Sequence, residues 1–283
     1  FVIAAVLIFV VASCEKEGVY NPKKKIDRVY YSFNNNGYTN YISNTDKYVK
    51  EVWNWDKNVL KGISFYDLDG MLEYVENYSY DNKTRLSEIS WGGNGKYTLT
   101  YDGKHLSRIE YIKGSSVEEV MEVSYDGKRL AEIKITDFDS DSKAAPMSPA
   151  IFRFFLPNLD EQSTARLLDK INTAKAAKAA ESYIIKFEWD GKNIKKITEE
   201  MGPYRYTMEY TYDNMSNPFK GLFDFDEFTM LENFSDNNVV KETAIYDNEI
   251  SEYTYCYTYD GKYPTTKTYN ANEYSYTYYY EYK

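Results

Sequence analysis

The stretch "YTLTYDGKHLSRIEYI" (Tyr97–Ile112) carries the pattern that decides the fold. Near copies read "MEVSYDGKRLAEIKI" (Met121–Ile135) and "IKFEWDGKNIKKI" (Ile185–Ile197). Across the chain, Tyr or Trp is followed by Asp nine times, where chance would give about 2.5 such pairs. The clear units begin 21 to 24 residues apart, a spacing that suits one two-stranded hairpin per unit. The pattern therefore predicts a series of β-hairpins.

The residues before each Asp alternate between apolar and polar. Tyr97, Leu99 and Tyr101 fall on one side of an extended chain, and Thr98 and Thr100 fall on the other. A period of two residues is typical of a strand that buries one face. Each unit therefore begins with a strand whose aromatic end is anchored in the core.

The Asp-Gly pair that follows predicts a tight turn. Glycine accepts a positive φ angle, and Asp bonds nearby backbone N–H groups. Beyond the turn, Leu106 and Ile109 lie three residues apart, so strict alternation breaks there. We expect a bulge or a longer loop before the second strand resumes. Because Asp recurs at this turn position, a turn role is favoured over ligand binding.

The C-terminal third extends the pattern into rows of tyrosine. The residues expected on one face are Tyr204, Tyr206, Met208, Tyr210 and Tyr212, then Tyr253, Tyr255, Tyr257 and Tyr259, then Tyr274, Tyr276, Tyr278, Tyr280 and Tyr282. The opposite faces carry small or polar residues, with Tyr279 as the large exception. A membrane-spanning barrel needs an apolar outward face, which neither face provides. We expect a soluble sheet with one wet face.

The N-terminus predicts export and a lipid anchor. Thirteen uncharged residues precede Cys14, too few for a membrane-spanning helix of about 20 residues but suited to the apolar region of a secretory signal. "VASC" (Val11–Cys14) resembles a bacterial lipobox, in which the cysteine is diacylated and becomes the mature N-terminus. The alternative is an ordinary signal peptide with an incidental cysteine. "EKEG" (Glu15–Gly18) resembles the acidic tags that direct Bacteroidetes lipoproteins to the outer surface.

Composition limits the class of partner. The net charge of −10 argues against nucleic acid and anionic lipid as partners, because both need a cationic face. We therefore expect contact with a membrane only through the N-terminal lipid anchor. The remaining cysteine, Cys256, is interpreted as a small strand residue rather than a reactive thiol.

One segment, residues 137–182, lacks the repeat. Its first part, "DFDSDSKAAPMSPA" (Asp137–Ala150), is typical of a loop, and Leu159–Ser182 predicts a helix. The expected division is a lipoprotein signal peptide and anchor site over residues 1–18, a tether over 19–29, and a repeat β domain over 30–283 that contains this loop and helix as an insertion.

The repeats resemble the YD repeats of Rhs and teneurin shells. They resemble still more closely a family of uncharacterised Bacteroidetes lipoproteins that are described as having a porin-like fold. "YDNMSNPF" (Tyr212–Phe219) and "YDGKYPTTKTY" (Tyr259–Tyr269) match two segments of that family. The resemblance implies an all-β fold, in which a large antiparallel sheet of repeated hairpins curls into a soluble barrel-like shell, here with one helical insertion. It implies no activity.

The residues give little support for catalysis or metal binding. The single histidine, His105, occupies a variable turn position of the repeat, so a turn residue is favoured over a general base. Asp137, Asp139 and Asp141 have the spacing that opens a calcium loop, but Ser142 and Ser148 replace the required Gly and Glu. We expect no catalytic residues, no metal and no cofactor.

Binding remains the open question. Aromatic rings stack on sugars, and Trp91 and Trp53 are candidate ligand-binding residues, although the same rings could equally fill the core. We expect a non-catalytic binding module for a glycan, peptide or protein in the cell envelope. We expect it to be lipid-anchored to the outer membrane, on either its periplasmic or its outer surface. The alternatives are a structural or assembly component of an envelope complex and, third, a carbohydrate-active enzyme.

Overall fold

The computed structural model describes residues 17–35, 47–93, 95–138, 183–202, 204–222, 232–246, 249–270 and 274–283. Within them the chain forms sixteen antiparallel strands and one short 3-10 helix, η2 (Glu232–Phe234). The strands are β1 (Ile26–Asn35), β2 (Tyr48–Asp56), β3 (Val59–Tyr66), β4 (Leu72–Tyr80), β5 (Leu86–Trp91), β6 (Gly95–Asp102), β7 (His105–Lys113), β8 (Ser116–Asp126), β9 (Arg129–Asp137), β10 (Tyr183–Asp190), β11 (Asn193–Met201), β12 (Tyr204–Ser216), β13 (Asn237–Tyr246), β14 (Glu249–Asp260), β15 (Tyr263–Asn270) and β16 (Tyr274–Tyr282).

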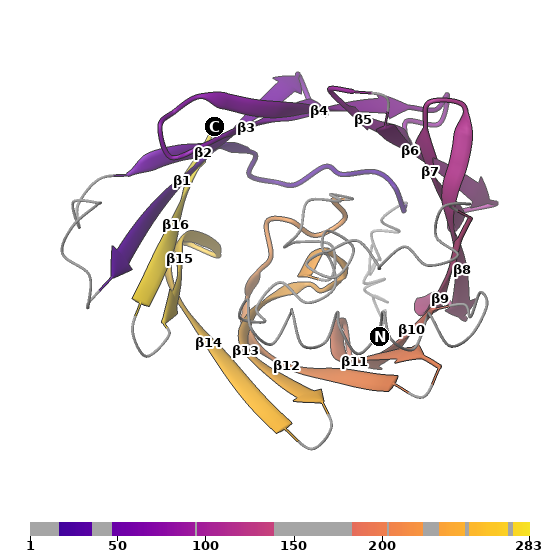
Figure 1. Cartoon of the computed structure of the whole chain (residues 1–283). Helices are drawn as coiled ribbons and strands as arrows, with labels where there is room; N and C mark the ends of the chain where they lie inside the picture. The colour runs from indigo at the N-terminus through magenta and orange to yellow at the C-terminus, as the bar shows by residue number, and fades with distance from the viewer. Residues whose placement is uncertain are drawn as a thin grey trace, which may run out of the picture.

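The strands close into one barrel. Each strand pairs with its neighbours in sequence, and β1 also pairs with β16, for example through Tyr31 opposite Tyr278. Figure 1 shows the resulting ring, in which the indigo first strand meets the yellow last strand. Closure pairs the strand edges that an open sheet would expose. The expected all-β, barrel-like shell of hairpins is confirmed, and its closure and strand number are now defined.

The expected bulge lies beside each turn. In the β6–β7 hairpin, Tyr101 faces Leu106 while Thr100 faces Arg108, so Ser107 is an extra residue on β7. Its hydroxyl donates a hydrogen bond to the Thr100 carbonyl at 3.1 Å. The same register shift adjoins the aromatic residue of six hairpins: Trp55, Tyr80, Tyr101, Tyr125, Trp189 and Tyr259. The bulge explains why Leu106 and Ile109 can both point inward although they lie three residues apart.

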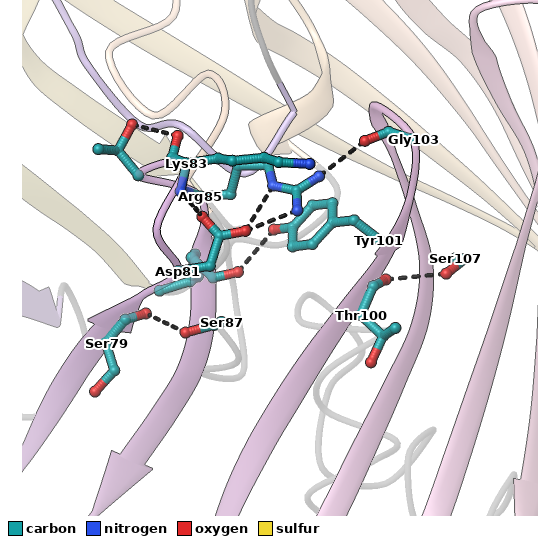
Figure 2. A network of polar contacts seen from close by, with 11 residues as sticks. Ser79, Asp81, Lys83, Arg85, Ser87, Thr100, Tyr101, Gly103 and Ser107 are labelled. Atoms are coloured by element: carbon teal, nitrogen blue, oxygen red, sulfur yellow. Dashed lines mark hydrogen bonds and ion pairs between the residues drawn. The ribbon is translucent and has the colours of Figure 1, made fainter.

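The aromatic side chains also join each hairpin to the one before it. Tyr101 Oη donates to the Leu86 carbonyl at 2.8 Å, beside the preceding bulge (Figure 2). Each such bond satisfies the polar tip of the ring and a backbone carbonyl at the same time. Equivalent bonds join Trp55 to Ile26, Tyr80 to Leu60, Trp189 to Leu130, Tyr212 to Ile194, Tyr257 to Val239 and Tyr282 to Pro264.

The turns that follow β2, β4, β6, β8, β10 and β14 lie at one end of the barrel, which we call the D-G end; the opposite end is called the far end. Just inside the D-G end, the last aliphatic residue of each repeat faces inward and is at most 2% exposed. These residues are Ile63, Ile89, Ile109, Ile133 and Ile197. Burial of apolar surface at about 25 cal/mol per Å² makes this layer a principal source of stability.

The outward face is polar. Charged residues pair across neighbouring strands, as in Lys186–Glu200 at 2.5 Å and Lys241–Glu252 at 2.6 Å. Tyr279 belongs to this face, because its neighbours Tyr278 and Tyr280 pack against the core; Lys47 lies over the Tyr279 ring at 3.7 Å. No helix of the described part is long and apolar enough to cross a membrane.

Where their side chains are described, the predicted tyrosine rows face inward, as expected; those of Tyr204 and Tyr274 lie outside the described part. Tyr206 and Tyr255 are each 6% exposed, and other members of the rows pack against the core. The charged face therefore lies outside while the rings pack inside, which is the arrangement that the period of two residues predicts.

The domain limits differ from the expected ones at one point. β1 begins at Ile26, whereas the β domain was expected to begin at residue 30, and the preceding residues from Glu17 are packed against the barrel. The segment expected to be a tether over 19–29 is therefore bound to the barrel. Cys14 and the expected helix at 159–182 lie outside the described residues.

Candidate functional site

The N-terminal segment Glu17–Lys25 runs across the D-G end (Figure 1). The Gly18 carbonyl accepts a hydrogen bond from the Leu86 N–H at 2.8 Å. Gly18 has a φ of +74°, and a Cβ there would lie 2.0 Å from Tyr101 Oη, so only glycine fits without displacing that ring. The segment is therefore an integral part of the barrel end.

Glu17 fixes the start of this segment. One carboxylate oxygen lies 3.0 Å from His105 Nδ1, and the other accepts from the Leu106 N–H and from Tyr125 Oη, each at 2.9 Å. Tyr125 is the aromatic residue of its hairpin, yet it donates to this carboxylate rather than to a backbone carbonyl. Hydrogen bonds to an ionised acceptor are stronger than bonds to a neutral one, so Glu17 is a firm attachment point.

A second segment fills the same end of the barrel. Between β12 and η2, Phe219 packs against Trp53 with 6.1 Å between ring centroids, and Tyr20 Oη donates to the Pro218 carbonyl at 2.8 Å. Trp53 is 2% exposed and also contacts Tyr20. The sequence left two interpretations of Trp53, and the structure matches the one in which the ring fills the core. A ligand could contact this ring only if Tyr20 and Phe219 moved.

Trp91 has a different environment at the far end. It ends β5, is half-buried, and stacks on Tyr111 at 6.0 Å with an interplanar angle of 5°. Tyr97 completes the cluster at 5.4 Å from Trp91. Gly92 and Gly93 follow directly, and a Cβ at either would meet nothing within 4 Å. Trp91 therefore combines a half-buried ring, held by two tyrosines, with a following glycine pair that has open space around it.

Four glutamates lie on the inward face: Glu76, Glu119, Glu199 and Glu242, each at most 5% exposed. Tyrosine hydroxyls hold two of them, Tyr78 at 2.7 Å from Glu76 and Tyr183 at 2.5 Å from Glu199. A buried carboxylate is costly unless it is hydrogen-bonded or neutral. The interior toward the far end is therefore a layer of tyrosines and carboxyl groups rather than a purely apolar core.

Glu199 has a strongly perturbed pKa. Burial raises its pKa from 4.5 to about 8, and the hydrogen bond from Tyr183 only partly opposes this effect. Its Oε1 has no hydrogen-bond partner in the described structure. Burial therefore favours the protonated, neutral form of this side chain.

The other candidate residues from the sequence do not come together in one site. His105 begins β7 at the D-G end and contacts Glu17, a role that its turn position did not suggest. The backbone of Asp137 ends β9, whereas Asp139, Asp141, Ser142 and Ser148 lie outside the described residues. Cys256 is exposed on β14. Among the described residues, no group of three or more His, Cys, Asp or Glu side chains is arranged to hold a metal ion.

Sequence reasoning missed the buried glutamates, although a signal was present. Glu199 lies two residues after inward-facing Ile197, and Glu119 lies two residues before inward-facing Met121. Following the period of two residues through these charged residues would have placed both inside the barrel. The contact of Glu17 with His105 joins residues 88 positions apart, so no local pattern could have indicated it.

Comparisons with known proteins identify similar structures only. No protein-family model and no curated protein matches the chain. A porin-like protein from Bacteroides uniformis ATCC 8492 is 12% identical, with 91% of this chain and 98% of that chain covered and a TM-score of 0.49. A porin-like protein from Bacteroides vulgatus ATCC 8482 is 10% identical at the same coverage, with a TM-score of 0.41.

A third similar structure is a complex described as TcdB2-TccC3-Cdc42. It is 15% identical over 82% of this chain and only 12% of that chain, with a TM-score of 0.33. The assignment of a closed barrel rests on the strand pairing described above. Membership of the lipoprotein family with YD repeats stays a prediction from the sequence motifs.

Proposed function

We propose that this protein is a cell-envelope lipoprotein, anchored to the outer membrane through a lipid on Cys14, and that it is a non-catalytic module that binds glycans. The anchor is supported by the lipobox residues Val11–Cys14. The charged pairs on the outward face support a barrel that stands in water beside the membrane rather than within it, because lipid would not solvate them.

The observation that carries the binding role is the half-buried Trp91. Its ring is held by Tyr97 and Tyr111, and the two glycines that follow it, Gly92 and Gly93, have open space around them. A rigid aromatic ring that is partly exposed can stack on the apolar face of a sugar without losing much conformational entropy on binding. The far end of the barrel is therefore the proposed binding end.

Binding can be tested with Trp91→Ala and a matched control. Wild-type protein should bind a subset of a glycan array, and Trp91→Ala should lose at least about tenfold in affinity because the stacking energy is removed. Leu68→Ser changes an exposed side chain at the same end and should leave glycan binding intact. A blank array with folded wild-type protein, or equal binding by Trp91→Ala, would contradict the glycan-binding role.

A second candidate function is assembly with another envelope protein. Leu68, Met71 and Leu72, in and beside the β3–β4 turn, are 48%, 67% and 55% exposed. Neighbouring exposed apolar side chains are typical of a protein contact. Cross-linking in intact envelopes separates the two candidates: a partner lost in Leu68→Ser with Met71→Ser but retained in Trp91→Ala would favour assembly.

The anchor has its own test. Mass spectrometry of the mature protein should find acyl chains on Cys14, and Cys14→Ser should release the protein from the membrane fraction. A mature N-terminus at another residue, or membrane retention of Cys14→Ser, would contradict the lipoprotein assignment.

A further inference from the structure

The position of the chain at Glu17 is fixed relative to the barrel. Its carboxylate holds donors from both β7 and β8: the Leu106 N–H and Tyr125 Oη at 2.9 Å, beside His105 Nδ1 at 3.0 Å. The following residues are attached as well, through the Gly18 carbonyl and Tyr20 Oη. The chain is therefore attached to the barrel from Glu17 onward.

Cys14 precedes Glu17 by three residues. Three fully extended residues span at most about 11 Å. The Cα atom of Cys14 therefore stays within that reach of the Cα atom of Glu17, which itself lies at the D-G end. The β7 strand runs from this end to the far end over nine residues, or about 30 Å along the strand.

We infer that the barrel is held with its D-G end against the phospholipid headgroups and its far end directed away from the membrane. This inference rests on the lipid anchor proposed above, and it adds the orientation and the surface that faces the lipid. A lipid on Cys14 leaves too little chain for the barrel to stand on its far end against the bilayer while the Glu17 contacts hold. The half-exposed Trp91 then faces the surroundings of the cell envelope rather than the lipid.

The side chains of the D-G end suit such a position. Six turns there each present an exposed lysine: Lys57, Lys83, Lys104, Lys128, Lys192 and Lys262. Each turn also carries an aspartate, so their combined charge is close to neutral. Charge alone therefore does not orient this end of the barrel; the short connection to Cys14 does. The long lysine side chains can still interact with lipid phosphate groups over the Debye length of about 8 Å.

The orientation can be measured by quenching on vesicles. A fluorophore is attached to acylated, full-length protein at Lys104→Cys in a D-G turn, or at Ser115→Cys in the β7–β8 turn of the far end, each in a Cys256→Ser background. The vesicles contain phosphatidylcholine and phosphatidylglycerol with a headgroup-linked quencher. We expect at least threefold stronger quenching at position 104 than at position 115. Equal quenching, or stronger quenching at position 115, overturns the orientation.

Two variants test the cause. A spacer of twelve Gly and Ser residues between Lys16 and Glu17 leaves the Glu17 contacts in place but adds a root-mean-square reach of about 20 Å, so the difference between the two positions should fall below twofold. Glu17→Ala with Tyr125→Phe should reduce the difference by releasing the segment, whereas the exposed Glu122→Ala on β8 should not. An unchanged difference in the spacer variant also overturns the proposed cause.

The same samples separate the two proposals. Mass spectrometry establishes whether Cys14 carries acyl chains. Without them the lipoprotein proposal fails and the orientation fails with it. Acylated Cys14 with equal quenching at both positions overturns the orientation alone.

Discussion

The two ends of the barrel are built in different ways. The D-G end repeats one unit, in which an inward aromatic ring, a turn and a bulge recur, and it is closed by Glu17–Lys25 and the Asn217–Leu222 segment. The far end contains half-buried Trp91 and exposed Leu68, and the layer of buried glutamates lies toward it. The repeat thus specifies the structure of the D-G end, whereas the far end is characterised by individual side chains.

This difference between the two ends indicates where a ligand-binding site is to be sought. At the D-G end, polar tips and carbonyl groups satisfy each other, as Tyr101 and Leu86 do in Figure 2. Asp81 and Arg85 form an ion pair at 2.7 Å in the same network, and Arg85 also donates to the Gly103 carbonyl at 3.0 Å. Substitutions at this end should mainly affect folding, whereas substitutions of Trp91 should mainly affect binding.

The two tryptophans give the largest expected contrast. Trp53→Ala removes a ring that is 2% exposed and should lower the free energy of unfolding by about 3–5 kcal/mol. Trp91→Ala removes a half-buried ring and should cost about 1 kcal/mol. Urea denaturation followed by circular dichroism measures both. Equal losses would contradict the distinction between a structural and an accessible ring.

The buried acid gives the next largest effect, through pH. The pKa of Glu199 is about 8 in the folded protein, above its ordinary value of 4.5. The folded state therefore holds this proton when the unfolded state has lost it, and the resulting stability is lost as pH rises from 4.5 to 8. The free energy of unfolding should fall by about 2–3 kcal/mol more in the wild type than in Glu199→Gln between pH 5.5 and 7.5.

The control for this measurement is the outward-facing Glu188→Gln on β10. Glu188 is exposed and lies 3.2 Å from Lys196, so its replacement should leave the pH dependence of stability unchanged. A wild-type pH dependence that persists in Glu199→Gln would show that another group is responsible.

A turn residue gives the smallest effect. Lys57 has a φ of +55°, in the turn position that Gly103, Gly127, Gly191 and Gly261 occupy in other hairpins. The left-handed conformation is strained for any residue with a Cβ, so Lys57→Gly should raise the free energy of unfolding by about 1 kcal/mol. Thermal unfolding measures this change, and Gly103→Lys should act in the opposite direction. A destabilising Lys57→Gly would mean that the side chain of Lys57 has an unrecognised role.

Much of the barrel wall could be predicted from Tyr97–Ile112 alone. The alternation predicted the inward faces, Asp-Gly predicted the turn, and the spacing of Leu106 and Ile109 predicted the bulge. These features are local, since each depends on residues a few positions apart. Closure between β1 and β16 could not be predicted in the same way, because it depends on twist and stagger accumulated over all strands.

The candidate site was less predictable for a related reason. A single sequence marks Trp53 and Trp91 as similar residues, and only the packing of Tyr20 and Phe219 separates them. The contact between Glu17 and Tyr125 likewise joins distant parts of the chain. Such interactions leave no periodic pattern.

The seam between β1 and β16 has a consequence for biogenesis. It brings together residues more than 240 positions apart, such as Tyr30 and Tyr279, and contacts so distant in sequence form slowly. An exported chain would expose two unpaired edges until its final strand arrived, so this interval is the moment at which a chaperone would matter most.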